Sequence, residues 1–293
     1  FFFAFCMICC AILSFFAPLA FADVRPYPPD VPWGPRWGHE YVTRLLQDQF
    51  EHVPHDLFYP QEDANKFDGA MSVVETFNTS QVHNDSRPWY EEHHFRITAP
   101  QSSRGYQYIW GQLRGVPSWI RGQYFRVANP IQHFSVLPPI VGCGVPPGAT
   151  LMETSHGSCE VALNAGFFDT HTFACHGNLV SDGEIVQNTA VQNVNFGITR
   201  NGTFVVGYLS KEDVLRYDFL QLVAGVGWLV RDGKPYANAS LALEDMATQE
   251  TGPSFSTVLT ARTALGHDAA GRLLAVTFDG VTPAEGGSLY DME

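Results

Sequence analysis

Positively charged residues are scarce in this chain. Its 293 residues include 17 Lys and Arg against 30 Asp and Glu, which gives a net charge of -13. A surface that binds nucleic acid needs a basic face to neutralise phosphates, so this balance argues against nucleic acid as a partner. Charged residues make up only 16% of the chain and aromatic residues 13%. That composition is typical of a packed globular domain and not of a disordered one.

Standard catalytic motifs are also missing. The sequence contains no G-x-S-x-G, H-E-x-x-H, P-loop or G-x-G-x-x-G pattern, so the usual signatures of serine hydrolases, zinc proteases and nucleotide-binding folds are absent. The run Glu91-Glu92-His93-His94 could suggest a metal, but adjacent histidines on a solvated stretch favour a plain surface. We expect no metal and no other cofactor.

Long apolar runs are absent beyond the N-terminus. Residues 1–22 carry no charge, and Pro18 followed by Ala20-Phe21-Ala22 gives the small-x-small pattern that precedes signal-peptide cleavage, with Asp23 as the first mature residue. An uncleaved anchor is the alternative, since about 20 apolar residues can span a bilayer. In both cases the pattern predicts entry into the secretory pathway. We expect the sequence to begin inside the signal, because its basic segment and initiator Met are missing.

Cysteine is sparse in the mature part, which retains only Cys143, Cys159 and Cys175. Thiols pair in an oxidising compartment, and an odd number leaves one free or paired with a residue outside the sequence. We expect Cys143 to pair with Cys159. Four N-glycosylation sequons fit the same compartment. They begin at Asn78, Asn84, Asn201 and Asn238.

Regular patterns are weak in residues 23–132, which are rich in proline at the start and carry scattered Trp and His. This region is interpreted as a pro-like segment or an irregular N-terminal domain. Patterned sequence follows in residues 133–293. The strands expected at 195–200 and 203–208 flank Asn201-Gly202, a strong hairpin signal that predicts a type I′ turn. Ser210 and Asp213 predict a capping box at the start of a short helix.

Further strands are expected at 221–230, 256–265 and 272–278. Serial strand–turn–strand units predict an α+β fold, made mainly of antiparallel sheet built from hairpins with a few short helices. Gly286-Gly287-Ser288 predicts a loop and an N-cap, with a helix beginning at Leu289. One helical turn is not stable alone, so we expect further chain and regard the domain as incomplete at its C-terminus.

Three short segments carry residues suited to chemistry. Asn164 follows the apolar run 161–163 and precedes Gly166, which permits close approach of a ligand; the two Phe that follow could wall a pocket or fill the core. Arg262 lies in an otherwise apolar strand, where a guanidinium is costly unless it pairs with a carboxylate or holds an anion through two parallel hydrogen bonds. Asp279 ends the partner strand, a position typical of a site and equally of a plain turn.

Several segments, taken together and in order, resemble the phosphodiester glycosidase family. The resemblance starts near His133 and covers somewhat over half of the chain, and residues 23–132 match more loosely. The matching segments are 133–137, 163–168, 177–183, 192–198, 207–210, 227–230 and 261–268. A Gly-rich Asp-Gly-Gly-Gly-Ser stretch of the family would lie beyond Glu293, as would its membrane span and a possible partner for Cys175. The copy in hand is therefore expected to lack a complete site.

The resemblance implies hydrolysis of the bond between the anomeric carbon of alpha-linked N-acetylglucosamine and a phosphate on mannose. It also implies that N-glycans bearing this diester are the partners and that the location is the Golgi lumen or outside the cell. Such a reaction suits Arg262 for stabilising phosphate charge and Asp279 for the oxocarbenium ion or its attacking water. Asn164 would hold the sugar, and His267 is a candidate for proton transfer. Substrate-binding candidates are Gly166, Asn178 and Thr263.

Two non-catalytic interpretations remain. The chain could be a secreted glycan-binding module on the same scaffold. It could also be a structural extracellular domain in which Arg262 and Asp279 pair with each other.

Overall fold

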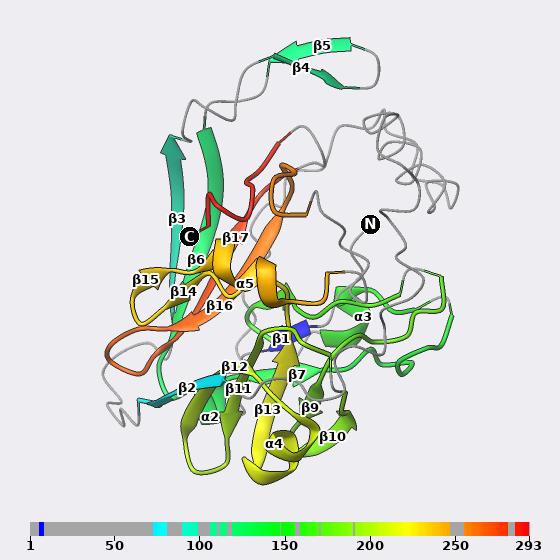
Figure 1. Cartoon of the computed structure of the whole chain (residues 1–293), viewed down its shortest axis with the longest axis vertical. Coiled ribbons are helices and arrows are strands. Elements are labelled where there is room, and N and C mark those ends of the chain that lie inside the picture. The colour runs from blue at the N-terminus through cyan, green and yellow to red at the C-terminus, as the bar shows by residue number, and fades with distance from the viewer. Residues whose placement is uncertain are drawn as a thin grey trace, which may run out of the picture.

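Antiparallel sheets dominate the computed structural model, whose helices are few and short (Figure 1). It describes residues 6–8, 73–80, 90–98, 106–109, 112–115, 119–146, 148–155, 159–169, 171–189, 191–246, 255–280 and 285–292. Every strand pair within these ranges is antiparallel. The predicted fold class is thus confirmed.

A six-stranded sheet forms one layer. Its order is β10 (Glu184–Gln187), β9 (Leu179–Ser181), β13 (Phe219–Ala224), β11 (Asn195–Thr199), β12 (Thr203–Tyr208) and β2 (Val73–Asn78). Val180, Val205 and Leu222 on one face pack with Val214 of α4 (Lys211–Arg216). That helix begins at the predicted capping box, in which Ser210 and Asp213 each accept a hydrogen bond from the other's backbone N–H.

A four-stranded sheet forms the other layer. Its order is β16 (Arg262–His267), β17 (Leu273–Phe278), β6 (Trp119–Val127) and β3 (Tyr90–Thr98). The two sheets share one apolar core, in which Phe125 and Leu273 of this sheet meet Phe196 and Phe204 of the six-stranded sheet. Burial of this shared face is the main force that holds the layers together.

Smaller elements complete the fold. A three-stranded sheet has the order β7 (Ser135–Leu137), β1 (Cys6–Ile8) and β8 (Ala162–Asn164). The two-stranded pairs are β14 (Val230–Arg231) with β15 (Lys234–Pro235) and β4 (Tyr106–Ile109) with β5 (Gln112–Gly115). The remaining helices are α2 (Pro130–His133), α3 (Leu151–Ser155) and α5 (Ala237–Leu243).

Strands that precede residue 133 are built into both main sheets. β2 pairs with β12 along its whole length, and β6 lies between β3 and β17. Within the predicted pro-like or irregular region, β2 and β6 therefore pair with later strands, whereas β4 and β5 form a hairpin with each other. The later partners of β2 and β6, which are β12 and β17, lie far away in sequence, so no local hairpin signal marks these two strands. Of the predicted signal peptide, the structure describes only residues 6–8.

The 199–203 turn differs from the prediction. Gly202 has φ +83°, whereas Asn201 does not have a positive φ, and the Gly202 N–H donates to the Thr199 carbonyl oxygen (3.0 Å). The connection is therefore a three-residue loop with a type I turn followed by a left-handed glycine, and not a type I′ turn. The strand predicted at 221–230 is also shorter, because β13 ends at Ala224 and Gly227 adopts φ +89°.

Helices that could cross a membrane are not found among the described residues.

Candidate functional site

Arg262 is the central charged residue of the candidate site. It is the first residue of β16, pairs with Phe278 of β17 and is only 7% exposed. Its Nε donates to the carbonyl oxygen of Gly287 (3.2 Å). Its Nη2 donates to the carbonyl oxygens of Phe255 (2.5 Å) and Val258 (2.8 Å). Backbone carbonyls therefore hold the guanidinium from two sides.

The carbonyl contacts limit how Arg262 can bind an anion. A guanidinium has five N–H donors, one on Nε and two on each Nη. Nε and both hydrogens of Nη2 are occupied, so no fork with two nitrogens remains for the two parallel hydrogen bonds expected from sequence. Among the described residues, Nη1 has no hydrogen-bond partner, and this nitrogen is not fully buried. Nη1 thus offers two donors to a ligand.

Burial lowers the pKa of Arg262 to about 10, although the nearby Asp291 carboxylate acts in the opposite direction. The guanidinium still carries its charge at neutral pH. No ion pair joins Arg262 to Asp279 in the described part of the chain. Arg262 is therefore a fixed, desolvated cation, the kind of group that stabilises negative charge without reorganising.

The last described segment lies against Arg262. Thr260 and Gly287 exchange two backbone hydrogen bonds (3.2 and 3.1 Å). The N–H and hydroxyl of Ser288 donate to the Asp291 carboxylate, and the Asp291 N–H donates back to the Ser288 hydroxyl. Ser288 thus makes the bonds of the predicted N-cap, but residues 289–292 form turns and not the helix predicted to begin at Leu289. The segment 285–292 thereby places the Gly287 carbonyl beside Nε of Arg262.

Two of the sequence-predicted segments meet at Phe255. Its ring lies under the guanidinium, with Arg262 Cζ 4.5 Å from the ring centroid. The same ring makes an edge-on contact with Phe167 at 5.7 Å between centroids. Phe167 thus contacts the ring that lies under the guanidinium. Asn164 at the end of β8 and Gly166 are half-buried in the same segment.

Strand alternation separates the other catalytic candidates. Directly opposed residues of an antiparallel pair share a face, so Arg262 and Phe278 lie on one face and Thr263 and His267 on the other. His267 is at the far end of β16, roughly 16 Å from Arg262 at the usual rise per residue, and it stacks between Phe77 and Phe204 (4.7 and 5.1 Å). The structure does not bring His267 to Arg262.

Asp279 is the exposed residue that follows Phe278 in β17. Its N–H donates to the Arg121 carbonyl oxygen (3.0 Å), so the pairing with β6 continues through this residue. Its side chain therefore projects from the face opposite Arg262, at the same end of the sheet. Gly280 brings the chain back towards Arg262, since a Cβ there would lie 2.8 Å from the Ala261 nitrogen.

Asn178 belongs to a buried polar network next to the six-stranded sheet. Its Nδ2 donates to Asn195 Oδ1 (3.1 Å), and its Oδ1 accepts from the Thr189 N–H (2.7 Å). The side chain of Asn195 in turn donates to the carbonyl oxygen of Asn193 (2.9 Å). Asn178 is 2% exposed, so these bonds give it a supporting position within the fold.

Glu244 is the residue in this network that sequence reasoning missed. It is 8% exposed and accepts hydrogen bonds from the N–H groups of Gly227 (2.9 Å) and Trp228 (3.3 Å). The Ser240 hydroxyl and Asn193 Nδ2 also donate to it. Burial raises its pKa, against the lowering effect of these donors. No spacing pattern marks it, because its donors come from four separate segments, the Tyr208 hydroxyl being the fourth.

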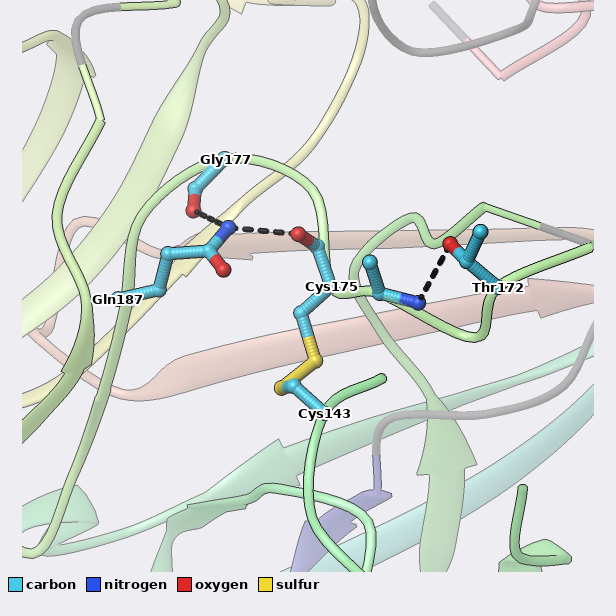
Figure 2. Close-up of a disulfide and its surroundings, with 6 residues drawn as sticks. Cys143, Thr172, Cys175, Gly177 and Gln187 are labelled. Atoms are coloured by element: carbon cyan, nitrogen blue, oxygen red, sulfur yellow. Dashed lines mark hydrogen bonds between the residues drawn. A yellow bond between two sulfur atoms is a disulfide. The ribbon is translucent and has the colours of Figure 1, made fainter. Parts of the chain in front are cut away.

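The disulfide differs from the expected one. Cys143 is bonded to Cys175, with their Cα atoms 5.3 Å apart (Figure 2), and the Cys159 thiol instead donates to the Ser155 carbonyl oxygen (3.5 Å). The predicted pair Cys143–Cys159 is therefore wrong. A Cys143–Cys159 bond would close a loop half as long as the Cys143–Cys175 loop, which lowers the entropic cost of closure by only about 0.6 kcal/mol. The local structure that brings Cys175 to Cys143 therefore decides the pairing.

That local structure is a turn in which the Phe173 N–H donates to the Asp169 carbonyl oxygen (2.8 Å). The Asp169 carboxylate accepts from the N–H groups of His171 and Thr172 (2.7 Å each). These bonds lower the pKa of Asp169 although burial acts the other way. The turn brings Cys175 back against Phe168, and the Gly144 N–H donates to the Phe173 carbonyl oxygen (2.7 Å). Figure 2 also shows Gln187, which donates to the carbonyl oxygens of Cys175 and Gly177.

Metal-binding groups of His, Cys, Asp or Glu are not found among the residues that the structure describes. His93 and His94 are adjacent in β3, so their side chains lie on opposite faces of the sheet. Each lies near a carboxylate of the same strand, Glu91 (3.7 Å) and Glu92 (3.1 Å) respectively.

Three sequon asparagines are exposed. They are Asn78 at the end of β2, Asn201 in the β11–β12 loop and Asn238 in α5. Asn84 lies outside the described residues.

Comparison with known proteins gives one consistent family. A family model described as phosphodiester glycosidase matches residues 157–293. The chain is 45% identical over 181 residues to mouse N-acetylglucosamine-1-phosphodiester alpha-N-acetylglucosaminidase and 44% identical over 181 residues to the human protein. Each match covers 59% of this chain but only 35% of the relative, so the chain spans about a third of the length of these curated relatives.

A solved structure extends the comparison to the fold. It is the zebrafish N-acetylglucosamine-1-phosphodiester alpha-N-acetylglucosaminidase catalytic domain, auto-inhibited by its pro-peptide. The two share 36% sequence identity and superpose with a TM-score of 0.63, over 75% of this chain and 70% of the zebrafish chain.

Proposed function

Because this chain belongs to the phosphodiester glycosidase family, we propose that it hydrolyses an alpha-N-acetylglucosamine-1-phosphate diester carried on mannose. The products are free N-acetylglucosamine and an exposed mannose 6-phosphate. The observation that carries the proposal is Arg262, a buried cation held by three backbone carbonyls beside the 164–169 segment. The names of the mouse and human relatives supply the sugar and the bond.

The leaving group explains why a fixed cation is the main requirement. Water attacks the anomeric carbon, the bond from that carbon to the phosphate oxygen breaks, and its electron pair leaves with the phosphate. The phosphate monoester is already a stable anion and needs charge stabilisation more than protonation. The two N–H donors on Nη1 of Arg262 are proposed to stabilise the charge of this phosphate. The proton of the attacking water passes to a base.

Asp279 is proposed as the carboxylate that supports the oxocarbenium ion or accepts the proton of water. Since its side chain leaves the sheet on the face opposite Arg262, the substrate would have to cross the open end of the β16–β17 hairpin. Asn164 and Gly166 are proposed sugar contacts. Thr263 lies on the same face as Asp279 at this end of the hairpin and stays a proposed substrate contact. The positions of Asn178 and His267 support other roles, because Asn178 is buried in a network and His267 stacks between two Phe rings at the far end of β16.

We also propose that this protein acts in the secretory pathway, in the Golgi lumen or outside the cell, on N-glycans bearing the diester. The apolar leader, the disulfide and the exposed sequons support this location. The zebrafish catalytic domain is described as auto-inhibited by its pro-peptide. By analogy, part of residues 23–132 is proposed to restrain this site.

The test is hydrolysis of N-acetylglucosamine-alpha-1-phospho-6-mannose in water enriched in oxygen-18. The proposal predicts free N-acetylglucosamine that carries the label and mannose 6-phosphate that does not, because water attacks carbon. Label in the phosphate would show attack at phosphorus and overturn the mechanism. Tight binding of the diester without any release would overturn the activity and identify a glycan-binding module.

A further inference from the structure

Glu244 occupies an unusual place for a carboxylate. It is the C-cap of α5 and 8% exposed, yet no Lys or Arg forms an ion pair with it in the described part of the chain. All of its described partners are hydrogen-bond donors without charge. A carboxylate in such a place costs free energy unless many donors surround it.

Glu244 ties the end of α5 to three other segments of the chain. Oε2 accepts from the Gly227 N–H (2.9 Å) and from Asn193 Nδ2 (3.2 Å). Oε1 accepts from the Trp228 N–H (3.3 Å), from the Tyr208 hydroxyl (3.4 Å) and from the Ser240 hydroxyl. Two consecutive backbone N–H groups therefore point at this carboxylate, and the Trp228 N–H also donates to the nearer Ser240 hydroxyl oxygen (2.7 Å), which itself donates to Glu244. This helps to fix the loop 225–228, whose first residue is held separately by the Gly225 N–H donating to the Val194 carbonyl oxygen (2.7 Å).

The fixed loop supports the segment that holds Arg262. Gly227 has φ +89°, and a Cβ on it would lie 2.7 Å from Cδ2 of Leu289. Leu289 is 4% exposed, and its N–H donates to the Ser256 carbonyl oxygen (2.9 Å). Two residues earlier, the Gly287 carbonyl accepts from Nε of Arg262 (3.2 Å).

We infer that Glu244 is a positioning residue for the Arg262 site, acting through the 225–228 loop, Leu289 and the Gly287 carbonyl. It touches neither Arg262 nor any group expected to react. Its effect is to hold the loop against which Leu289 packs, so that the carbonyl cage keeps the guanidinium in one orientation. This inference rests on the proposed function for its catalytic consequence, but its structural part can be tested without turnover.

Amide hydrogen exchange in the intact chain tests the structural part. Glu244→Ala should speed exchange of the Gly227, Trp228, Gly287 and Leu289 amides by at least about 10-fold, because the loop and the segment loosen together. The matched control is Glu153→Ala, which removes a carboxylate that accepts the Thr150 N–H at 2.8 Å on α3. It should leave these four amides unchanged.

Two milder variants keep the test decisive if Glu244→Ala does not fold. Glu244→Gln retains one acceptor oxygen and should loosen the same four amides to a smaller degree. Leu289→Ala should loosen Gly287 while the Gly227 and Trp228 amides stay protected. Faster exchange confined to Gly227 and Trp228 in the Glu244 variants would overturn the inference, because the loop would not support the segment.

Turnover separates this inference from the proposed function. If the wild type hydrolyses the diester, Glu244→Gln should lower kcat about 10-fold or more with little change in KM. The reason is that misplacing Arg262 weakens transition-state stabilisation. An unchanged kcat would overturn the catalytic consequence. Absence of hydrolysis in the wild type would refute the proposed function alone, and the exchange result would still decide whether Glu244 positions the segment.

Discussion

The guanidinium of Arg262 stacks over the ring of Phe255 and at the same time donates through Nη2 to the carbonyl oxygen of that residue. One residue thus supplies both a π-face and an acceptor to the same cation. Cation–π contacts of desolvated groups contribute up to about 2 kcal/mol. Phe255 therefore fixes the plane of the guanidinium as well as its position.

Replacing Arg262 should cost stability as well as activity. Arg262→Ala leaves the carbonyls of Phe255, Val258 and Gly287 without their donor, and we expect the free energy of unfolding to fall by about 2–4 kcal/mol. Urea unfolding measures this change. Arg200→Ala is the matched control, because that exposed arginine pairs with Asp218 at the surface (3.2 Å), and it should change the same free energy by less than about 1 kcal/mol. Equal effects of the two substitutions would contradict a buried carbonyl cage.

The loop glycine Gly227 should tolerate no side chain. Gly227→Ala combines a left-handed φ of +89° with a contact to Leu289 that is too short, and we expect a loss of about 1–3 kcal/mol. Gly233→Ala measures the cost of the left-handed backbone alone, since Gly233 has φ +67° and a Cβ added there would have nothing within 4 Å. Its cost should be about 1 kcal/mol. Thermal unfolding of both variants gives the difference, and an equal cost would show that Leu289 does not press on Gly227.

Removing the disulfide should lower the stability of the fold more than removing the remaining thiol of Cys159. Cys143→Ser or Cys175→Ser opens a covalent link across a sequence separation of 32 and should lower stability by about 2–4 kcal/mol. Cys159→Ser should have a much smaller effect. Peptide mapping without reduction identifies the linked peptides directly. Recovery of a peptide linking Cys143 to Cys159 would contradict the observed pairing.

The raised pKa of Glu244 predicts how stability depends on pH. The folded carboxyl binds its proton more tightly than the unfolded one, whose reference pKa is 4.5. Its contribution is complete below that value and declines as the pH rises through the folded pKa. Glu244→Gln should flatten this part of the profile, measured by urea unfolding between about pH 4 and pH 8. An unchanged slope in the variant would show that another group is responsible.

Local signals predicted the parts of the fold that are local in sequence. The strands around Asn201-Gly202 and the Ser210 cap follow from turn and capping residues, and the structure confirms them. β2 and β6 could not be found in this way, because their partners β12 and β17 lie far along the chain. The strand β3, which pairs with β6, and the local hairpin of β4 and β5 carried no turn signal that the prediction used. The predicted strand at 221–230 was too long, since the apolar run continues into the loop that packs against Leu289.

Sequence reasoning found the cation of the site but not what surrounds it. Arg262 was visible as a charge within an apolar strand, whereas the carbonyls that hold it carry no side-chain signature. Strand alternation then places His267 and Thr263 on the opposite face, which a list of motifs does not reveal. Glu244 was missed for a related reason, because a carboxylate that binds backbone N–H groups is recognised only in three dimensions.

The central claim is that Arg262 stabilises the phosphate released from N-acetylglucosamine. Its most direct test is the rate of N-acetylglucosamine release from the phosphomannose diester by wild type, Arg262→Ala and Arg200→Ala, each compared at equal amounts of folded protein. The account predicts that Arg262→Ala lowers kcat by about 10²–10³-fold, as for the loss of a main charge-stabilising donor, while Arg200→Ala stays near wild type. Folded Arg262→Ala that releases the sugar at the wild-type rate would contradict it.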